Sequence, residues 1–169
     1  MTMVELLGLD WYKRINNNMD QLKAALQVLL ADTFLMYFKA QSYHWNVEGM
    51  FFSQYHDFFG ELYEEVYGAI DPTAEHIRIC CDTYAPMSLM EMYNYKTVSE
   101  DTVKPVLITD MLNNLLATNQ VVINDLNKVF ELAEGMNNQG LMDFIAARID
   151  AHNKHAWMLR SSAKNPTGN

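Results

Sequence analysis

Few residues in this chain can end a helix. Glycine and proline, the residue types that most often interrupt helices, number 7 and 4 among 169 residues. So few interruptions favour a small number of long helices over many short strands. Hydrophobic residues make up 50% of the chain and charged residues 20%, which is ordinary for a globular protein and unlike a disordered one. An all-β fold is therefore nearly excluded, and one compact core is expected.

Apolar side chains recur at helical spacing in four long runs, of which the first carries Leu22, Leu26 and Leu29. A shorter run lies in the connection between the second and third, residues 82–104, and predicts a short extra helix near 88–93. Two helical hairpins joined by one long crossover predict an all-α fold, a four-helix bundle of ferritin-like connectivity. The predicted long helices span residues 16–44, 53–79, 109–134 and 140–164.

The whole chain, residues 1–169, is expected to form a single domain. Within it, residues 16–164 are predicted to make the helical bundle, starting from Asn16 to Asn18 as candidate caps. Residues 1–15 and 165–169 are predicted to be terminal tails, the second of them a polar segment without helix-forming content.

The charge balance argues against nucleic acid as a partner. The chain has 12 basic and 21 acidic residues, which gives a net charge of −9 with neutral histidines. A surface of this charge repels phosphate backbones and attracts cations. DNA binding is therefore expected to be weak.

Targeting and redox features favour a cytoplasmic protein. The segment 1–14 lacks the basic, apolar and small-residue order of a secretory signal, so we expect no export. No run reaches the ~18 consecutive apolar residues that a membrane span requires. The two cysteines, Cys80 and Cys81, are adjacent and cannot link distant segments, which fits a reducing compartment.

Two histidines and two carboxylates are the candidates for metal chemistry. His44 ends the first predicted helix and His56 lies near the start of the second, while Asp71 and Glu75 are four residues apart and share one helix face. Imidazole together with carboxylate suits Fe(II), whereas a soft metal would call for nearby thiolates. Iron is therefore the leading metal.

A structural interpretation of the same residues stays open at this point. A histidine such as His44 on an apolar stripe can be an ordinary core residue. The run from Asp71 through Pro72 to Glu75 is also typical of a helix start, with the aspartate as N-cap. In that case the second helix would break near Gly68 and the two carboxylates would only cap backbone amides. Spacing alone does not choose between these interpretations.

Longer motifs resemble the signature of the Dps family of mini-ferritins. The resemblance lies in Tyr43-His44-Trp45-Asn46-Val47-Glu48-Gly49, in the aromatic and histidine positions that follow, and in Asp71-Pro72-Thr73-Ala74-Glu75-His76-Ile77-Arg78. The stretch from Ala156 to Ser161 and the helix lengths extend it over nearly the whole chain.

This resemblance implies a homo-oligomeric, dodecameric shell that oxidises Fe(II) with hydrogen peroxide or O2 and stores the ferric mineral, protecting against oxidative damage. It implies that each ferroxidase site, with one iron or two, lies between subunits. His44 and His56 would come from one subunit, and Asp71 and Glu75 from the partner subunit. Acidic residues Glu134 and Asp143 match the family's pore positions.

One position departs from the family pattern. The acidic residue usually found four positions after the second histidine is replaced by Gly60, so we expect a more weakly held iron unless water or Glu61 substitutes. Carboxylates on the second helix, Glu65 among them, are candidates for mineral nucleation or for an ordinary solvated face. His152 and His155 are expected to be a surface pair without a role.

The alternative function is a DNA-coating structural shell with impaired iron oxidation. Family members often coat DNA through lysine-rich termini. Here the first fourteen residues contain only Lys13 and Arg14, and the last nine only Lys164. Counterion release would therefore contribute little binding free energy.

Overall fold

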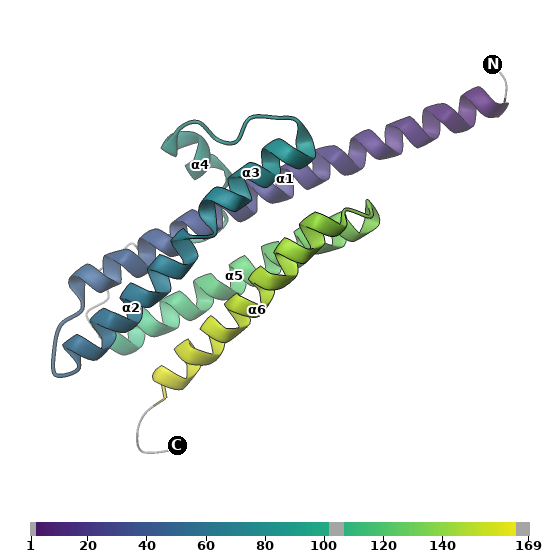
Figure 1. The fold of residues 1–169 in the computed structure, drawn as a ribbon. Coiled ribbons are helices and arrows are strands. Elements are labelled where there is room, and N and C mark those ends of the chain that lie inside the picture. Colours follow the sequence, from purple (N-terminus) through teal and green to yellow (C-terminus); the bar gives the residue numbers. More distant parts are fainter. Residues whose placement is uncertain (1–2, 102–106, 165–169) are drawn as a thin grey trace.

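The computed structural model describes residues 3–101 and 107–164, with side chains from residue 16 onward (Figure 1). Within this part of the chain all regular structure is helical, so the predicted all-α bundle with a short crossover helix is confirmed. Its helices are α1 (Met3–Asn46), α2 (Phe52–Tyr67), α3 (Ile70–Cys81), α4 (Leu89–Tyr95), α5 (Ile108–Gly135) and α6 (Gln139–Ser162).

The first helix is longer than predicted. It begins at Met3, so residues 3–15 are helical and Asn16 to Asn18 lie inside α1 instead of capping it. An asparagine inside a helix costs less than about 1 kcal/mol relative to alanine, and this segment contains no proline to stop the helix. At 1.5 Å per residue α1 is about 66 Å long, and its N-terminal part extends past the other helices (Figure 1). The predicted tail 165–169 lies outside the described residues.

The predicted second helix is two helices, α2 and α3, separated at Gly68 and Ala69. Two features interrupt the regular hydrogen bonding here. Pro72 has no N–H to donate to the Gly68 carbonyl. The Ala69 N–H donates to the carbonyl three residues before it, that of Val66, at 3.1 Å. Gly68 keeps right-handed helical dihedrals, with φ −59°, so α3 continues along α1 in the direction of α2 (Figure 1). The break near Gly68 that the sequence allowed is therefore present, but it is a mild interruption.

Two antiparallel hairpins enclose the core: α1 packs against α2 and α3, and α5 packs against α6 (Figure 1). The predicted apolar stripes supply the interior, which is made mainly of leucine, isoleucine and valine. Representative fully buried side chains are Leu22, Leu26, Leu29, Phe59, Ile77, Leu112, Leu115, Leu141 and Ile145. None of the described helices is long and apolar enough to cross a membrane.

The crossover is anchored to α1 by a buried carboxylate. Asp32 is fully buried and accepts hydrogen bonds from the Thr97 and Val98 amides at 2.8 and 3.0 Å. The short helix α4 starts at Ser88, whose hydroxyl accepts a hydrogen bond from the Glu91 amide at 3.1 Å. These local bonds give the long connection a defined path across α1.

Candidate metal centre

The turn between α1 and α2 brings the two candidate histidines together. His44 lies in the last turn of α1 and His56 in the first turns of α2. Val47 is buried under the turn, which anchors it to the core. Gly49 adopts φ +108°, a conformation that residues with a side chain rarely reach, so this tight turn depends on glycine.

The two imidazoles hold each other through the backbone. His44 Nδ1 lies 2.6 Å from the carbonyl oxygen of His56, and His56 Nδ1 lies 2.9 Å from that of His44. The rings stack with centroids 3.7 Å apart. Because a carbonyl oxygen can only accept, we assign the proton of each neutral ring to Nδ1, which leaves both Nε2 atoms with a free lone pair. This is the tautomer that a metal-binding histidine needs.

Gly60 is explained by its contact with one of these rings. A Cβ atom at position 60 would lie 3.3 Å from Nδ1 and 3.4 Å from Cε1 of His44. Such contacts are tighter than most side chains tolerate, so any residue other than glycine would press on the imidazole. Glu61, the candidate to substitute for the missing carboxylate, lines a cavity of about 360 Å³ between α2 and α6, and its role as a ligand stays a prediction.

Asp71 and Glu75 lie on α3, exposed and one helical turn apart. The N-cap position of α3 is Ala69, so Asp71 is in the first turn and does not have the N-cap role that the structural interpretation gave it. Among the described residues, no group of three or more His, Cys, Asp or Glu side chains converges to hold a metal ion. The structure thus brings His44 and His56 together, while the two carboxylates stay apart on α3.

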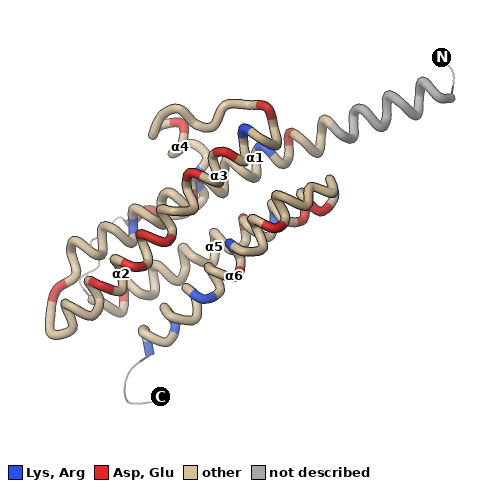
Figure 2. Tube along the Cα trace, viewed as in Figure 1, with Lys and Arg blue, Asp and Glu red and all other residues tan. Residues whose placement is uncertain are grey.

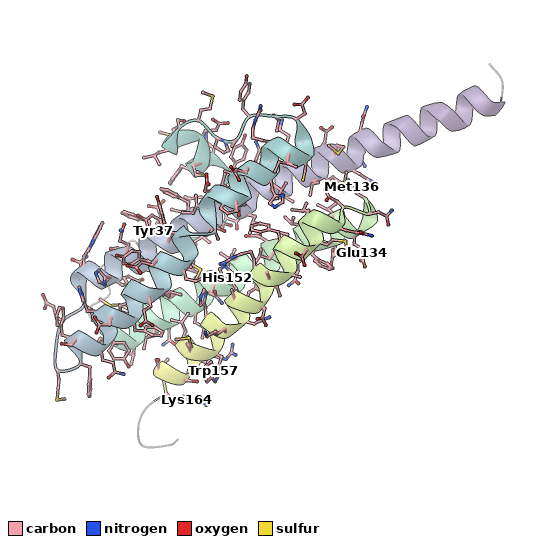
Figure 3. The ribbon with its side chains drawn as sticks, viewed as in Figure 1. Tyr37, Glu134, Met136, His152, Trp157 and Lys164 are labelled. Atoms are coloured by element: carbon pink, nitrogen blue, oxygen red, sulfur yellow. The ribbon has the colours of Figure 1, made fainter. Side chains whose placement is uncertain are left out.

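Apolar side chains surround the histidine pair without being covered. Trp45 is 60% exposed and Phe51 53%, and the Phe52 ring stacks on His56 with centroids 5.0 Å apart. Trp157, which Figure 3 labels on α6, is 61% exposed. Large apolar side chains that are left exposed in this way are typical of an interaction site.

His152, which Figure 3 labels on α6, and His155 are both buried, so the prediction of a surface pair is wrong. His152 Nδ1 is 2.7 Å from the Asn119 side-chain oxygen, and the Asn119 amide donates to the His152 carbonyl at 2.9 Å. Burial first, and then the charge of Arg148, lower the pKa of His152 well below its usual value. The missed signal was periodic: both histidines continue the apolar stripe of α6.

Glu65, an exposed residue of α2, contacts the same group of charged and histidine side chains. It pairs with both guanidinium nitrogens of Arg148 and with His155 Nε2 at 3.2 Å. Burial alone would raise the pKa of Glu65, but the hydrogen bond and charge of Arg148 outweigh it and lower the pKa. Glu65 is therefore held in an ion pair with Arg148 although its side chain is 39% exposed, and its role in mineral nucleation stays a prediction.

Carboxylates dominate the rest of the surface along this hairpin. Asp57, Glu61, Glu64 and Glu65 are the charged residues of α2, which has no lysine or arginine (Figure 2). Glu134 and Asp143, the two candidate pore residues, are exposed on either side of the turn between α5 and α6, where Figure 3 labels Glu134. Whether this turn lines a pore stays a prediction.

Comparison with known proteins agrees with the fold and with these motifs. The family model for the ferritin-like domain matches residues 23–166. A low temperature-induced protein of Nostoc sp. is 32% identical over 133 residues, which cover 78% of this chain and 74% of that protein. DNA protection during starvation protein 2 of Bacillus anthracis is 28% identical over 142 residues, covering 82% and 96%.

Solved structures give the same picture of the fold. Dps from Thermosynechococcus elongatus superimposes with a TM-score of 0.83 at 23% identity, covering 88% of this chain and 94% of that one. Dps from Vibrio cholerae, described as a member of a broad superfamily of ferritin-like diiron-carboxylate proteins, reaches 0.81 at 24% identity, covering 88% and 92%. With the histidine-bearing turn and the single crossover, these matches show that the chain belongs to the Dps family within the ferritin-like proteins.

Proposed function

We propose that this protein oxidises Fe(II) at a site shared between two copies of the chain and stores the ferric product inside a dodecameric shell. The observation that carries the proposal is the reciprocal hydrogen bonding of His44 and His56. Two imidazoles whose Nδ1 atoms face carbonyl oxygens and whose Nε2 atoms are available to a metal, next to exposed aromatic side chains, are half of a metal site.

The second half is expected from Asp71 and Glu75 of the partner subunit. On α3 these two carboxylates are exposed and lie on one face of the helix, where a partner subunit could reach both of them. Covering the exposed Trp45 and Phe51 would supply apolar burial for the association of the two copies. A site completed only by assembly also accounts for the incomplete ligand set in one chain.

The ligand chemistry favours iron as the substrate. Histidine nitrogens and carboxylate oxygens suit Fe(II), and the one pair of thiols lies elsewhere, at the end of α3. Burial raises the pKa of Cys81 to about 11, so this thiol stays protonated and is a poor metal ligand. Hydrogen peroxide is the proposed oxidant, because it accepts two electrons from two Fe(II) ions without releasing hydroxyl radical.

The test is iron oxidation by variants that remove one half-site at a time. Purified protein is loaded with Fe(II) without oxygen, peroxide is added, and ferric absorbance is followed. The variant His44→Ala, His56→Ala and the variant Asp71→Asn, Glu75→Gln should each lose fast oxidation. Glu131→Gln, an exposed carboxylate of α5, is the matched control and should keep it. Equal rates in all four proteins would refute the proposal.

Co-assembly separates a shared site from a site within one chain. Shells reassembled from a mixture of the two double variants contain interfaces at which one copy supplies intact histidines and the other intact carboxylates. Such shells should recover part of the wild-type rate, although neither variant oxidises iron by itself. A mixture as inactive as its components would show that the two halves do not meet between subunits.

DNA coating is the alternative that the family resemblance raises. The name of the Bacillus anthracis relative refers to DNA protection, but the net charge of −9 in this chain opposes binding to phosphate backbones. The side chains of Lys13 and Arg14 are outside the described part of the structure. We therefore expect no retention of plasmid DNA in a mobility-shift assay at low salt.

A further inference from the structure

His76 and Cys80 bring two metal-binding side chains together near the end of α3. They are one helical turn apart and lie on the same face of the helix. The Cys80 sulfur lies 4.0 Å from Nδ1 of His76. Both side chains are half-buried, and the His76 ring packs on that of Phe144 in α6, with centroids 4.6 Å apart. The pair therefore faces α6 of its own chain, whereas Asp71 and Glu75 lie on the exposed side of α3.

The turn between α5 and α6 lies beside the end of α3 and supplies a hydrogen-bond donor to the Cys80 sulfur (Figure 1). Asn138 is the N-cap of α6, and its side-chain oxygen accepts a hydrogen bond from the Leu141 amide at 3.2 Å. With the oxygen engaged there, the side-chain nitrogen is directed to the Cys80 sulfur, 3.4 Å away. An N–H group in this position stabilises a thiolate, and donors of this kind commonly support the ligands of a metal ion.

The distance between the two ligand atoms indicates which kind of metal the pair suits. At 4.0 Å a thiol and an imidazole make no more than a weak hydrogen bond. Metal bonds of about 2.3 Å to sulfur and about 2.0 Å to nitrogen span this distance when the angle between them is roughly 140°. The tetrahedral angle that zinc prefers would bring the same two atoms to about 3.5 Å. One thiolate and one imidazole at a wider angle suit Cu(I), a soft ion that accepts two or three ligands.

We propose that Cys80 and His76 form a binding site for Cu(I) within one chain. The ion takes the place of the thiol proton, which leaves to solvent, and it binds the Cys80 sulfur and Nδ1 of His76 without a change of oxidation state. The contact with Phe144 fixes the imidazole ring, and the Asn138 amide fixes the sulfur, so binding requires little rearrangement. The site shares no residue with the proposed iron site and does not depend on it.

Cys81 provides an internal comparison for Cys80. It is the next residue of α3 and is also half-buried, but the helix turns its side chain by about 100° relative to that of Cys80. The cation that acts on the Cys81 thiol is Lys23, on α1. Cys81 thus offers the same chemistry in a different direction, and its replacement should leave the proposed site intact.

The experiment measures Cu(I) binding by assembled protein without oxygen, in competition with a colorimetric Cu(I) chelator. X-ray absorption spectroscopy of the bound copper identifies its ligands. Cys80→Ser should bind one Cu(I) per chain fewer than the wild type and should lose the sulfur ligand. His76→Gln should weaken this site by about tenfold or more. Cys81→Ser is the matched control and should bind as the wild type does.

Circular dichroism and the oligomer size confirm that each variant is folded and assembled. Equal Cu(I) binding by the wild type and Cys80→Ser would refute the site. Equal losses in Cys80→Ser and Cys81→Ser, or two sulfur ligands per copper in the wild type, would assign the metal to the adjacent thiols and refute the pair with His76. Zn(II) held by the wild type as tightly as Cu(I) would refute the choice of metal.

Iron oxidation by the same proteins separates this inference from the proposed function. Cys80→Ser should oxidise Fe(II) at the wild-type rate, and a slower rate would place the thiol in the iron site instead of a separate one. A wild type that does not oxidise iron, but binds one Cu(I) more than Cys80→Ser, would overturn the ferroxidase proposal and leave the copper site standing.

Discussion

Replacing Asp125 with asparagine tests a pair of carboxyl groups, one half-buried and one fully buried, that joins α5 to α1. Asp125 hydrogen-bonds to Asp32, the fully buried anchor of the crossover, and its Oδ2 atom has no hydrogen-bond partner. Burial, followed by the charge of Asp32 and the hydrogen bond to it, raises the pKa of Asp125 to about 7. At lower pH the Asp125 carboxyl is protonated and can donate to Asp32, whereas above this pKa two carboxylates face each other.

The sign of the pH dependence follows from this shift. The pKa of Asp125 in the folded protein is higher than the unfolded value of 3.8, so its stabilising contribution is complete below about pH 4. The contribution declines as the pH rises and is lost above about pH 7. Three pKa units correspond to about 4 kcal/mol. Because Asp125 is only half-buried, solvent screening lowers the measurable part to about 1–2 kcal/mol.

Asparagine imitates the protonated acid at every pH, since its amide can donate to Asp32 and does not titrate. Asp125→Asn should therefore match the wild type near pH 4.5 and be more stable at pH 8. A gain of about 1–2 kcal/mol corresponds to a rise in Tm of roughly 3–6 °C for a chain of this size. Thermal unfolding is measured at one protein concentration, because assembly makes Tm concentration-dependent.

Glu131→Gln removes an exposed carboxylate from the same helix and is the control for a general charge effect. It should change Tm little, and equally at both pH values. An Asp125→Asn variant that is destabilised at pH 8, or that shows the same shift at both pH values, would refute a shared proton between the two carboxyl groups.

Three further predictions concern single buried positions. Asp32→Ala leaves the Thr97 amide and its neighbour without an acceptor, so urea unfolding should show a loss of about 2–5 kcal/mol. Gly60→Ala should slow iron oxidation, because the added Cβ presses on His44, while urea unfolding stays within about 1 kcal/mol of wild type. The lowered pKa of His152 means that stability is lost as the pH falls below about 6.5. His152→Leu should flatten that dependence in unfolding measured from pH 7 to 5, even though its stability starts lower.

Each of these predictions has a result that contradicts it. An Asp32→Ala protein as stable as the wild type would mean that the crossover is held by other contacts. Unchanged iron oxidation by Gly60→Ala would show that the imidazole position is not critical. A His152→Leu variant with the wild-type slope would place the titrating group elsewhere.

The sequence was sufficient for the number, type and order of the long helices. Periodicity of the kind shown by Leu22, Leu26 and Leu29 is a local property, because each side chain's place on the helix face depends only on its position along the chain. The same holds for His44 and His56, which a short turn keeps close in any fold that contains this hairpin. The motifs were specific enough to identify the family.

Only the tertiary structure determined the contacts between residues that are distant in the chain. The burial of His152 and His155 and the contact of Asp125 with Asp32 arise only when the helices pack. The local pattern also predicted the wrong start for α1. Asn16 to Asn18 resemble a helix cap, whereas the residues before them are helical from Met3 onward. Helical spacing places a residue on a face of its own helix, whereas packing determines which other residues that face meets.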